Sequence, residues 1–156
     1  MELHHHRSKD THNGRVILPR ALTSPVPPLG AGYTGAEMRL VDYTLAKRAK
    51  LTELRGGRLS RDDVCDAHPE LLRAARNVGE RTPTPCPVCE AEPLVHVTYV
   101  FGDALRQANG RVWPRTGLAD LHRSMDEVAC YVVEVCTACY WNHLAQRYLL
   151  GRRHVG

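Results

Sequence analysis

Two Cys-x-x-Cys pairs constrain this chain more than any other feature of its sequence. The first pair is Cys86 and Cys89, the second is Cys136 and Cys139, and 46 residues separate the pairs. Each pair can place two thiolates on a tight turn, and two such turns facing each other supply the four ligands of a tetrahedral Zn²⁺ site. We therefore predict one structural zinc ion held by these four cysteines.

The long separation of the pairs indicates that a small sheet lies between them. Compact zinc motifs usually have about 15 to 20 residues between their pairs. Residues 94–100 and 128–135 are rich in β-branched side chains and predict two strands, and the second leads directly into Cys136. A strand beside each metal turn is the architecture of a zinc ribbon, in which the metal supplies folding free energy that so small a sheet lacks.

The N-terminal half predicts helices that follow an extended arm. Residues 1–36 mix proline and glycine without any period, so we expect an arm outside the fold. From residue 37 to residue 54 apolar side chains recur every three to four positions, which is typical of one helical face. Ser60 and Pro69 are suited to the starts of further helices, and the helical segment extends to residue 80.

The remaining segments complete an α+β fold. We interpret residues 81–85 as a linker, residues 104–120 as a loop with a short strand near Trp113, and Cys130 as a core side chain. Helical spacing from Tyr140 to Leu150 predicts a C-terminal helix, followed by a basic tail at 152–156. The predicted architecture is a set of N-terminal helices packed on a small antiparallel zinc-ribbon sheet in residues 81–151, closed by that C-terminal helix.

Composition narrows the location and the class of partner. The chain of 156 residues has six cysteines, and its N-terminus has no apolar stretch typical of a secretory signal, so we expect a reducing cytoplasm. No run approaches the roughly 18 apolar residues of a membrane span, and we predict no membrane association. The formal net charge of +4 is only mildly basic, which permits nucleic acid as a partner without requiring it.

Other potential metal ligands give alternatives to the four-thiolate site. Cys65 and His68 are three residues apart and could form part of a second site, and His143 could replace one thiolate. His68 and Glu70, followed by Cys86 and Cys89, also match the letters of the zinc deaminase signature, in which Glu shuttles protons. That assignment leaves the second Cys pair without a role. Four thiolates leave no open coordination position, so we predict no catalytic residues and keep the zinc-dependent deaminase as the alternative.

Four stretches of this sequence together resemble a family of small actinobacterial zinc-ribbon proteins. The resemblance covers residues 37–151. It implies a cytoplasmic zinc-ribbon protein with a helical N-terminal half, and it implies no particular activity. The stretches are Asp63-Val-Cys-Asp-Ala-His-Pro-Glu-Leu-Leu-Arg-Ala-Ala75, Cys86-Pro-Val-Cys89, Thr98-Tyr-Val-Phe-Gly-Asp103 and Cys136-Thr-Ala-Cys-Tyr-Trp-Asn-His-Leu144.

The function expected from these features is that of a non-enzymatic adaptor. Zinc ribbons often serve transcription, and this analogy between folds predicts binding to RNA polymerase, to an associated factor or to nucleic acid. A thiol-sensing or zinc-sensing interaction module is a further alternative. Trp113 and Trp141 are candidate anchors for a protein partner, and the alternative for both is a place in the core. Nucleic-acid affinity should be weak and carried by clustered cations, namely Lys47, Arg48, Lys50, Arg73, Arg76 and residues 152–153.

Overall fold

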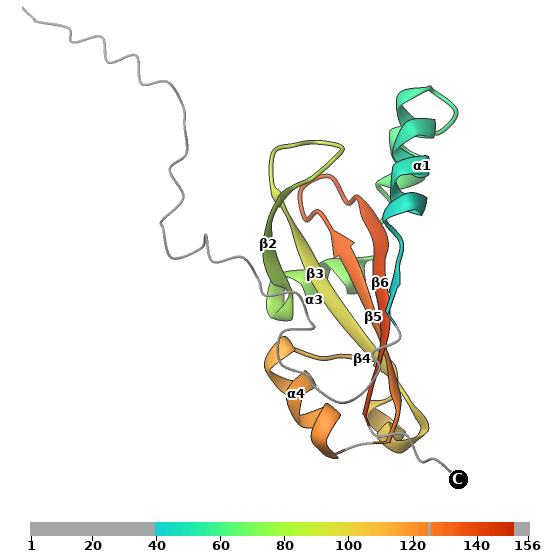
Figure 1. Ribbon diagram of the computed structural model, residues 1–156. Coiled ribbons are helices and arrows are strands. Elements are labelled where there is room, and N and C mark those ends of the chain that lie inside the picture. Colours follow the sequence, from blue (N-terminus) through green and yellow to red (C-terminus); the bar gives the residue numbers. More distant parts are fainter. Residues whose placement is uncertain (1–39, 125, 152–156) are drawn as a thin grey trace, which may run out of the picture.

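The computed structural model describes residues 40–124 and 126–151 of the chain. The arm predicted for residues 1–36 and the tail predicted for 152–156 lie outside this described part. Within it, helices and one antiparallel sheet together confirm the α+β class (Figure 1).

Six strands form the sheet, in the order β1-β6-β5-β3-β2, with β4 paired to the end of β3. The strands at the centre of the sheet are β3 and β5, which pair over seven residue positions, and β5 also pairs with β6. All the pairings are antiparallel. The strands are β1 (Val41–Asp42), β2 (Glu80–Pro85), β3 (Pro93–Phe101), β4 (Arg111–Val112), β5 (Val128–Val135) and β6 (Asn142–Leu150).

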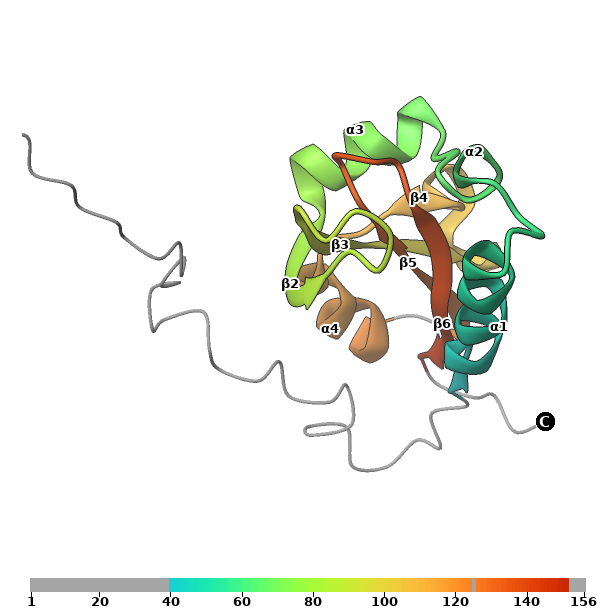
Figure 2. The same cartoon turned by 90° about the horizontal axis from the view of Figure 1, so that it is seen from above.

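Helices cover both faces of the sheet and one of its edges. Figure 2 shows α3 and α4 on opposite faces, with α1 alongside β6. The predicted starts at Ser60 and Pro69 are confirmed, because Ser60 forms a capping box with Asp63, and Pro69 is the first residue of α3. The helices are α1 (Thr44–Arg55), α2 (Arg61–Val64), α3 (Pro69–Val78) and α4 (Arg115–Ser124), with a 3₁₀ segment η2 (Asp103–Ala108).

The C-terminal helix predicted from Tyr140 to Leu150 is wrong, because this stretch forms strand β6. Its buried side chains, Tyr148 and Leu150, alternate with more exposed ones, as expected for one face of a strand. Their spacing from Leu144 also fits a helix, so periodicity alone could not separate the two structures. Backbone pairing with β5, from Val135↔Asn142 to Val128↔Leu150, favours the strand. In this hairpin the N–H and C=O groups along one side of β5 find hydrogen-bond partners.

The linker predicted at residues 81–85 is also wrong, because these residues belong to β2. Two of them, Pro83 and Pro85, lack an N–H group and would interrupt a central strand. At the sheet edge, however, one side of the strand needs no partner, so proline is tolerated there. The predicted first helix likewise starts later than expected, at Thr44, because Val41 and Asp42 pair with β6 as the short strand β1.

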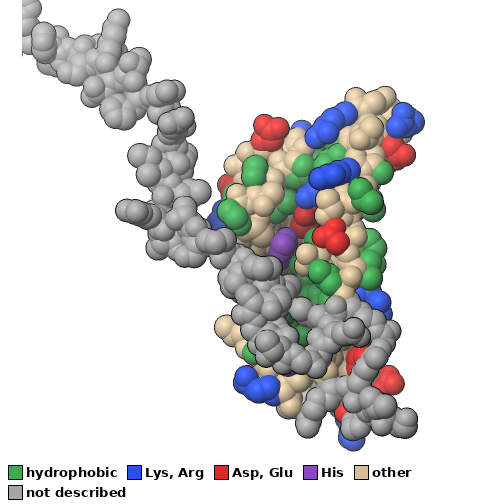
Figure 3. Space-filling view, viewed as in Figure 1, with side chains coloured by type: hydrophobic (Ala, Val, Ile, Leu, Met, Phe, Trp, Pro, Cys, Tyr) green, Lys and Arg blue, Asp and Glu red, His purple; other side chains and the backbone are tan. Residues whose placement is uncertain are grey.

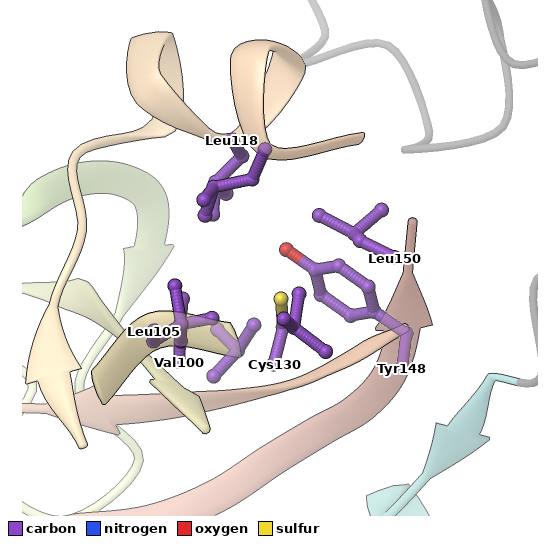
Figure 4. Packing of buried hydrophobic residues seen from close by; sticks show 9 residues of the cluster. Val100, Leu105, Leu118, Cys130, Tyr148 and Leu150 are labelled. Carbon is purple, nitrogen blue, oxygen red and sulfur yellow. The ribbon is translucent and has the colours of Figure 1, made fainter. Parts of the chain in front are cut away.

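The core lies in layers on the two sides of the sheet. On one side α4 contributes Leu118, which packs toward Val100, Cys130 and Tyr148 of the sheet (Figure 4). Cys130 is fully buried, as predicted for a core residue, and burial raises the pKa of its thiol to about 12. On the other side the buried residues of α3 pack against β3 and β5; this cluster comprises Ala67, Leu71, Leu72, Ala75, Val95, Val97 and Val135.

Candidate metal centre

Two hairpin turns at the same end of the sheet bring the Cys-x-x-Cys pairs together. Residues 86–89 lie in the connection from β2 to β3, and residues 136–139 lie in the connection from β5 to β6 (Figure 1). Both hairpins belong to one sheet, in which β3 and β5 are direct neighbours. The strand pairing therefore places the two turns side by side, although 46 residues separate them in the chain.

The two turns repeat the same backbone structure. In each, the residue after the second cysteine donates its N–H to the carbonyl of the first: Glu90 to Cys86 at 3.0 Å and Tyr140 to Cys136 at 2.9 Å. Glu90 and Tyr140 also share a left-handed conformation, with φ of 57° and 69°. This conformation is unfavourable for residues other than glycine, and it costs each turn about 1 kcal/mol of conformational free energy. Such matching turns present two thiols each in equivalent positions.

The four thiols form a compact cluster that fits a tetrahedral metal ion. The Sγ atoms of Cys86 and Cys139 lie 3.5 Å apart, those of Cys89 and Cys136 lie 3.6 Å apart, and all four lie within 4.8 Å of one another. Zinc–sulfur bonds of about 2.3 Å place tetrahedral thiolates about 3.8 Å apart. The predicted ligands are therefore assembled, and a metal ion such as zinc could be held by them.

The surroundings of these thiols affect their protonation differently. Burial raises the pKa of the Cys86 and Cys139 thiols. Burial opposes ionisation of Cys89 too, but hydrogen bonds from the Ala91 backbone and from the neighbouring thiols lower its pKa to about 7. A cluster with one readily ionised thiol can begin to bind a cation at neutral pH, because thiolates are the ligand form.

A fifth cysteine lies beside this cluster. The Sγ atom of Cys65, at the end of α2, is 3.8 Å from Sγ of Cys139. Two hydrogen bonds tie the segment after Cys65 to the second turn: Ala67 N–H donates to the Tyr140 carbonyl at 3.0 Å, and the Asn142 amide donates to Asp66 at 2.9 Å. Sequence spacing gave no signal for this contact, because 74 positions separate Cys65 from Cys139.

The alternative ligand sets are not assembled in the described residues. The imidazole Nδ1 of His68 accepts a hydrogen bond from the Glu70 backbone N–H at 3.2 Å, so His68 caps α3. Among residues 40–124 and 126–151, the four-cysteine cluster is the only group of three or more metal-type side chains with ligand atoms this close. Neither the deaminase set with His68 and Glu70 nor a second site with Cys65 and His68 is formed. His143 also stays outside the cluster, with its ring stacked parallel to that of Trp141.

Trp141 supports the metal turns and is not a surface anchor. Its side chain is fully buried, and its indole N–H donates to Oε1 of Glu134 at 3.1 Å. Trp113 is half-buried and packs against the α4 side of the core. The core alternative is therefore confirmed for Trp141, and Glu134, which sequence reasoning missed, is the buried acid that accepts from its indole. In the sequence Glu134 lies within an apolar, β-branched stretch that predicts a strand and gives no sign of a buried ion pair.

Comparison with known proteins gives the family. The model of DUF5318, described as a family of unknown function, matches residues 35–155. This chain belongs to that family. Among its relatives are the uncharacterized protein Rv0049 of Mycobacterium tuberculosis strain H37Rv and the uncharacterized protein Mb0050 of Mycobacterium bovis. Each is 43% identical over 111 residues, which cover 71% of this chain and 81% of the relative. No solved structure matches.

These relatives confirm that the chain resembles actinobacterial proteins. The four-cysteine cluster supports the zinc-ribbon assignment. No helix in the described part of the chain is both long enough and apolar enough to span a bilayer. The cytoplasmic location stays a prediction.

Proposed function

We propose that this protein is a non-enzymatic accessory protein built around one structural zinc ion, and that it acts by binding the transcription machinery or nucleic acid. The observation that carries the proposal is the compact cluster of four thiols on two adjacent hairpin turns. Such a ligand set stabilises a fold and leaves no coordination position for a substrate. The link to transcription rests on the frequent use of zinc ribbons in that process, an analogy between folds.

Exposed apolar side chains favour a protein as the partner. Leu40 and Val41 lie at the start of β1, Leu45 lies in the first turn of α1, and all three are exposed, Leu45 by 77%. We call these three residues the α1 patch. Tyr140, at the tip of the second metal turn, is 45% exposed. Clustered apolar groups on a surface are typical of protein contacts, in which a few such residues carry most of the binding free energy.

Several cations expected to contact nucleic acid are engaged within the protein. Lys47 forms an ion pair with the buried Glu134 at 2.7 Å, and Arg73 pairs with Glu70 on α3. Lys50 lies over the Trp141 ring, 5.5 Å from its centroid. Cations that are engaged in this way contribute less to counterion release on binding DNA or RNA, so we expect the affinity to be weak.

The test is direct binding to purified actinobacterial RNA polymerase by calorimetry. We expect Leu45→Asp to weaken binding tenfold or more, because it places a charge in the α1 patch. The control is Ala49→Asp, which adds the same charge at another exposed position of α1 and should leave the affinity unchanged.

DNA and RNA are titrated in parallel over a salt series. Absence of polymerase binding contradicts the protein-partner form of the proposal. Tight sequence-specific DNA binding that survives high salt and is lost in Arg73→Ala would contradict the weak nucleic-acid affinity and identify α3 as a recognition helix.

A second function, thiol sensing, is favoured by the contact between Cys65 and Cys139. The two sulfur atoms lie 3.8 Å apart, so a modest movement would allow a disulfide. The exposed guanidinium of Arg61 interacts mainly with Cys65 and less strongly with Cys139. Both interactions raise the pKa of Arg61, so a cation lies beside this pair of thiols.

The oxidation is a two-electron reaction with hydrogen peroxide. One thiolate of the pair attacks peroxide, forms a sulfenic acid and releases hydroxide. The second thiol then displaces hydroxide from that sulfur, which gives the Cys65–Cys139 disulfide and water. Because Cys139 is one of the four clustered cysteines, the disulfide removes one ligand from the metal site.

We expect peroxide to produce the Cys65–Cys139 disulfide together with metal release, detected by peptide mapping and a zinc-sensitive dye. Cys65→Ser should keep its metal before treatment and release it several-fold more slowly. Cys130→Ser is the matched control, because Cys130 lies in the core on the α4 side, and it should respond as the wild type does. Equal release rates in all three proteins would contradict thiol sensing by Cys65.

A further inference from the structure

We propose that a pocket between α1 and the sheet is a binding site for a small oxyanion, either a carboxylate or a phosphate group of a metabolite. The site is separate from the four cysteines and does not depend on the adaptor function. It is formed where α1 crosses the edge of the sheet beside β6.

The pocket is a hollow of about 280 Å³, and both polar and apolar groups line it. This volume is just below the roughly 300 Å³ at which small-molecule sites begin, so its occupant must be small. Figure 3 shows a histidine surface and charged side chains gathered in the hollow beside α1. The lining comes from the start of α1 and from neighbouring strands and consists of Asp42, Tyr43, Thr44, Lys47, Arg48, Leu51, His96, Glu134, His143, Ala145 and Gln146.

A row of three side chains on adjacent strands forms the floor of the pocket. His96 of β3 pairs in register with Glu134 of β5, and Glu134 pairs with His143 of β6. Glu134 is only 4% exposed, and its carboxylate is fixed by the Lys47 ammonium and by the Trp141 indole N–H. The floor is therefore rigid and charged before any ligand arrives, which lowers the cost of ordering on binding.

The acceptor groups of the pocket are already occupied. Both oxygens of Glu134 accept from Lys47, at 2.7 and 2.8 Å. Asp42 accepts from Thr44, whose hydrogen bonds lower the pKa of the Asp42 carboxyl. A cationic ligand would therefore have to compete with the Lys47 ammonium for the Glu134 carboxylate.

Donor groups, in contrast, remain available. Arg48 is exposed, and it acts on Asp42 through its charge rather than through a hydrogen bond. Nδ1 of His143 is buried and makes no hydrogen bond with the described residues. The positive end of α1 lies at this pocket, where the Asp42 carboxylate accepts from the Thr44 N–H of its first residue. This excess of donors over free acceptors selects a ligand that carries acceptor oxygens and negative charge.

A metal ion is a poorer occupant, although two histidines and a carboxylate are a common ligand set. In the described part of the chain, only the four cysteines bring three or more ligand atoms within 4.8 Å of one another. Burial lowers the pKa of both His96 and His143, so both imidazoles are neutral at pH 7 and can donate to an oxyanion.

The test is titration of the full chain with inorganic phosphate and, separately, with succinate, at constant ionic strength. Heat of binding and the NMR signals of the His96 and His143 side chains are recorded. We expect saturable binding of at least one anion with a dissociation constant of roughly 1 mM, together with shifts of both histidine signals. The anion that binds distinguishes a carboxylate from a phosphate ligand.

Arg48→Gln should weaken this binding at least tenfold, because it removes the exposed guanidinium at the pocket. Arg55→Gln is the matched control, since Arg55 is exposed on the same helix outside the pocket lining, and it should bind as the wild type does. Both substitutions are at exposed positions, so the fold and the metal content should be unchanged. If neither anion saturates, or if the Arg48 and Arg55 variants bind equally, the proposal is wrong.

Discussion

Replacing Cys136 by serine is expected to abolish metal binding and to unfold the end of the sheet that carries the two turns. Cys136 is fully buried and lies in one cluster with Cys86, Leu94 and Trp141. Metal binding to structural four-ligand sites contributes an apparent 10 to 16 kcal/mol, roughly, in small zinc peptides. This contribution is comparable to the total stability of about 5 to 15 kcal/mol of a typical domain. The metal content per chain and the thermal unfolding curve measure the effect.

Cys130→Ser is the control for this substitution. Cys130 is equally buried, but it packs among apolar side chains on the α4 side of the sheet. A serine there should cost about 1 to 2 kcal/mol as a buried polar group and should leave the metal content at one ion per chain. Full metal content and unchanged melting in Cys136→Ser would contradict the four-thiolate site.

Removing the carboxylate of Glu134 is expected to destabilise the fold by about 3 kcal/mol. In Glu134→Ala the buried indole N–H of Trp141 loses its acceptor, and the Lys47 ammonium loses its partner. The Lys47 side chain is 22% exposed and can turn toward water, so the loss falls at the lower end of the range for buried ion pairs. Urea unfolding at a fixed zinc concentration measures the difference.

Two further variants are compared with Glu134→Ala. Glu134→Gln keeps an acceptor oxygen for Trp141 and removes only the charge, so it should cost about half as much as the alanine variant. Glu53→Ala removes an exposed carboxylate from α1 and should change the stability by less than about 0.5 kcal/mol. If Glu134→Ala were as mild as Glu53→Ala, Glu134 would not hold Trp141 and α1 together.

The four cysteines that the sequence predicts as metal ligands lie together in the structure, and within each pair the sequence signal is local. Cys86 and Cys89 are separated by two residues and lie in one turn. Only the position of this turn beside the second one depends on the rest of the fold. Helices with clear caps, such as α2 after Ser60 and α3 at Pro69, were also predicted correctly. In each case short-range backbone chemistry decides the structure.

The features that were missed depend on contacts between distant segments. Strand β6 has side-chain spacing that fits a helix, and pairing with β5 decides in favour of the strand. The contact of Cys65 with Cys139 and the ion pair of Lys47 with Glu134 join residues 74 and 87 positions apart. Composition and spacing within either segment contain no information about such pairs, because the topology of the sheet creates them.

The prolines of β2 also limit how another chain can approach this protein. The open side of an edge strand usually offers N–H and C=O groups on which a further strand can form. Pro83 and Pro85 remove two N–H groups from β2, and the strand at the other edge, β1, has only two residues. Strand addition, a common mode of peptide recognition, is therefore disfavoured along β2. Self-association through β-pairing is suppressed for the same reason, and a partner has to recognise the protein through side chains rather than through its backbone.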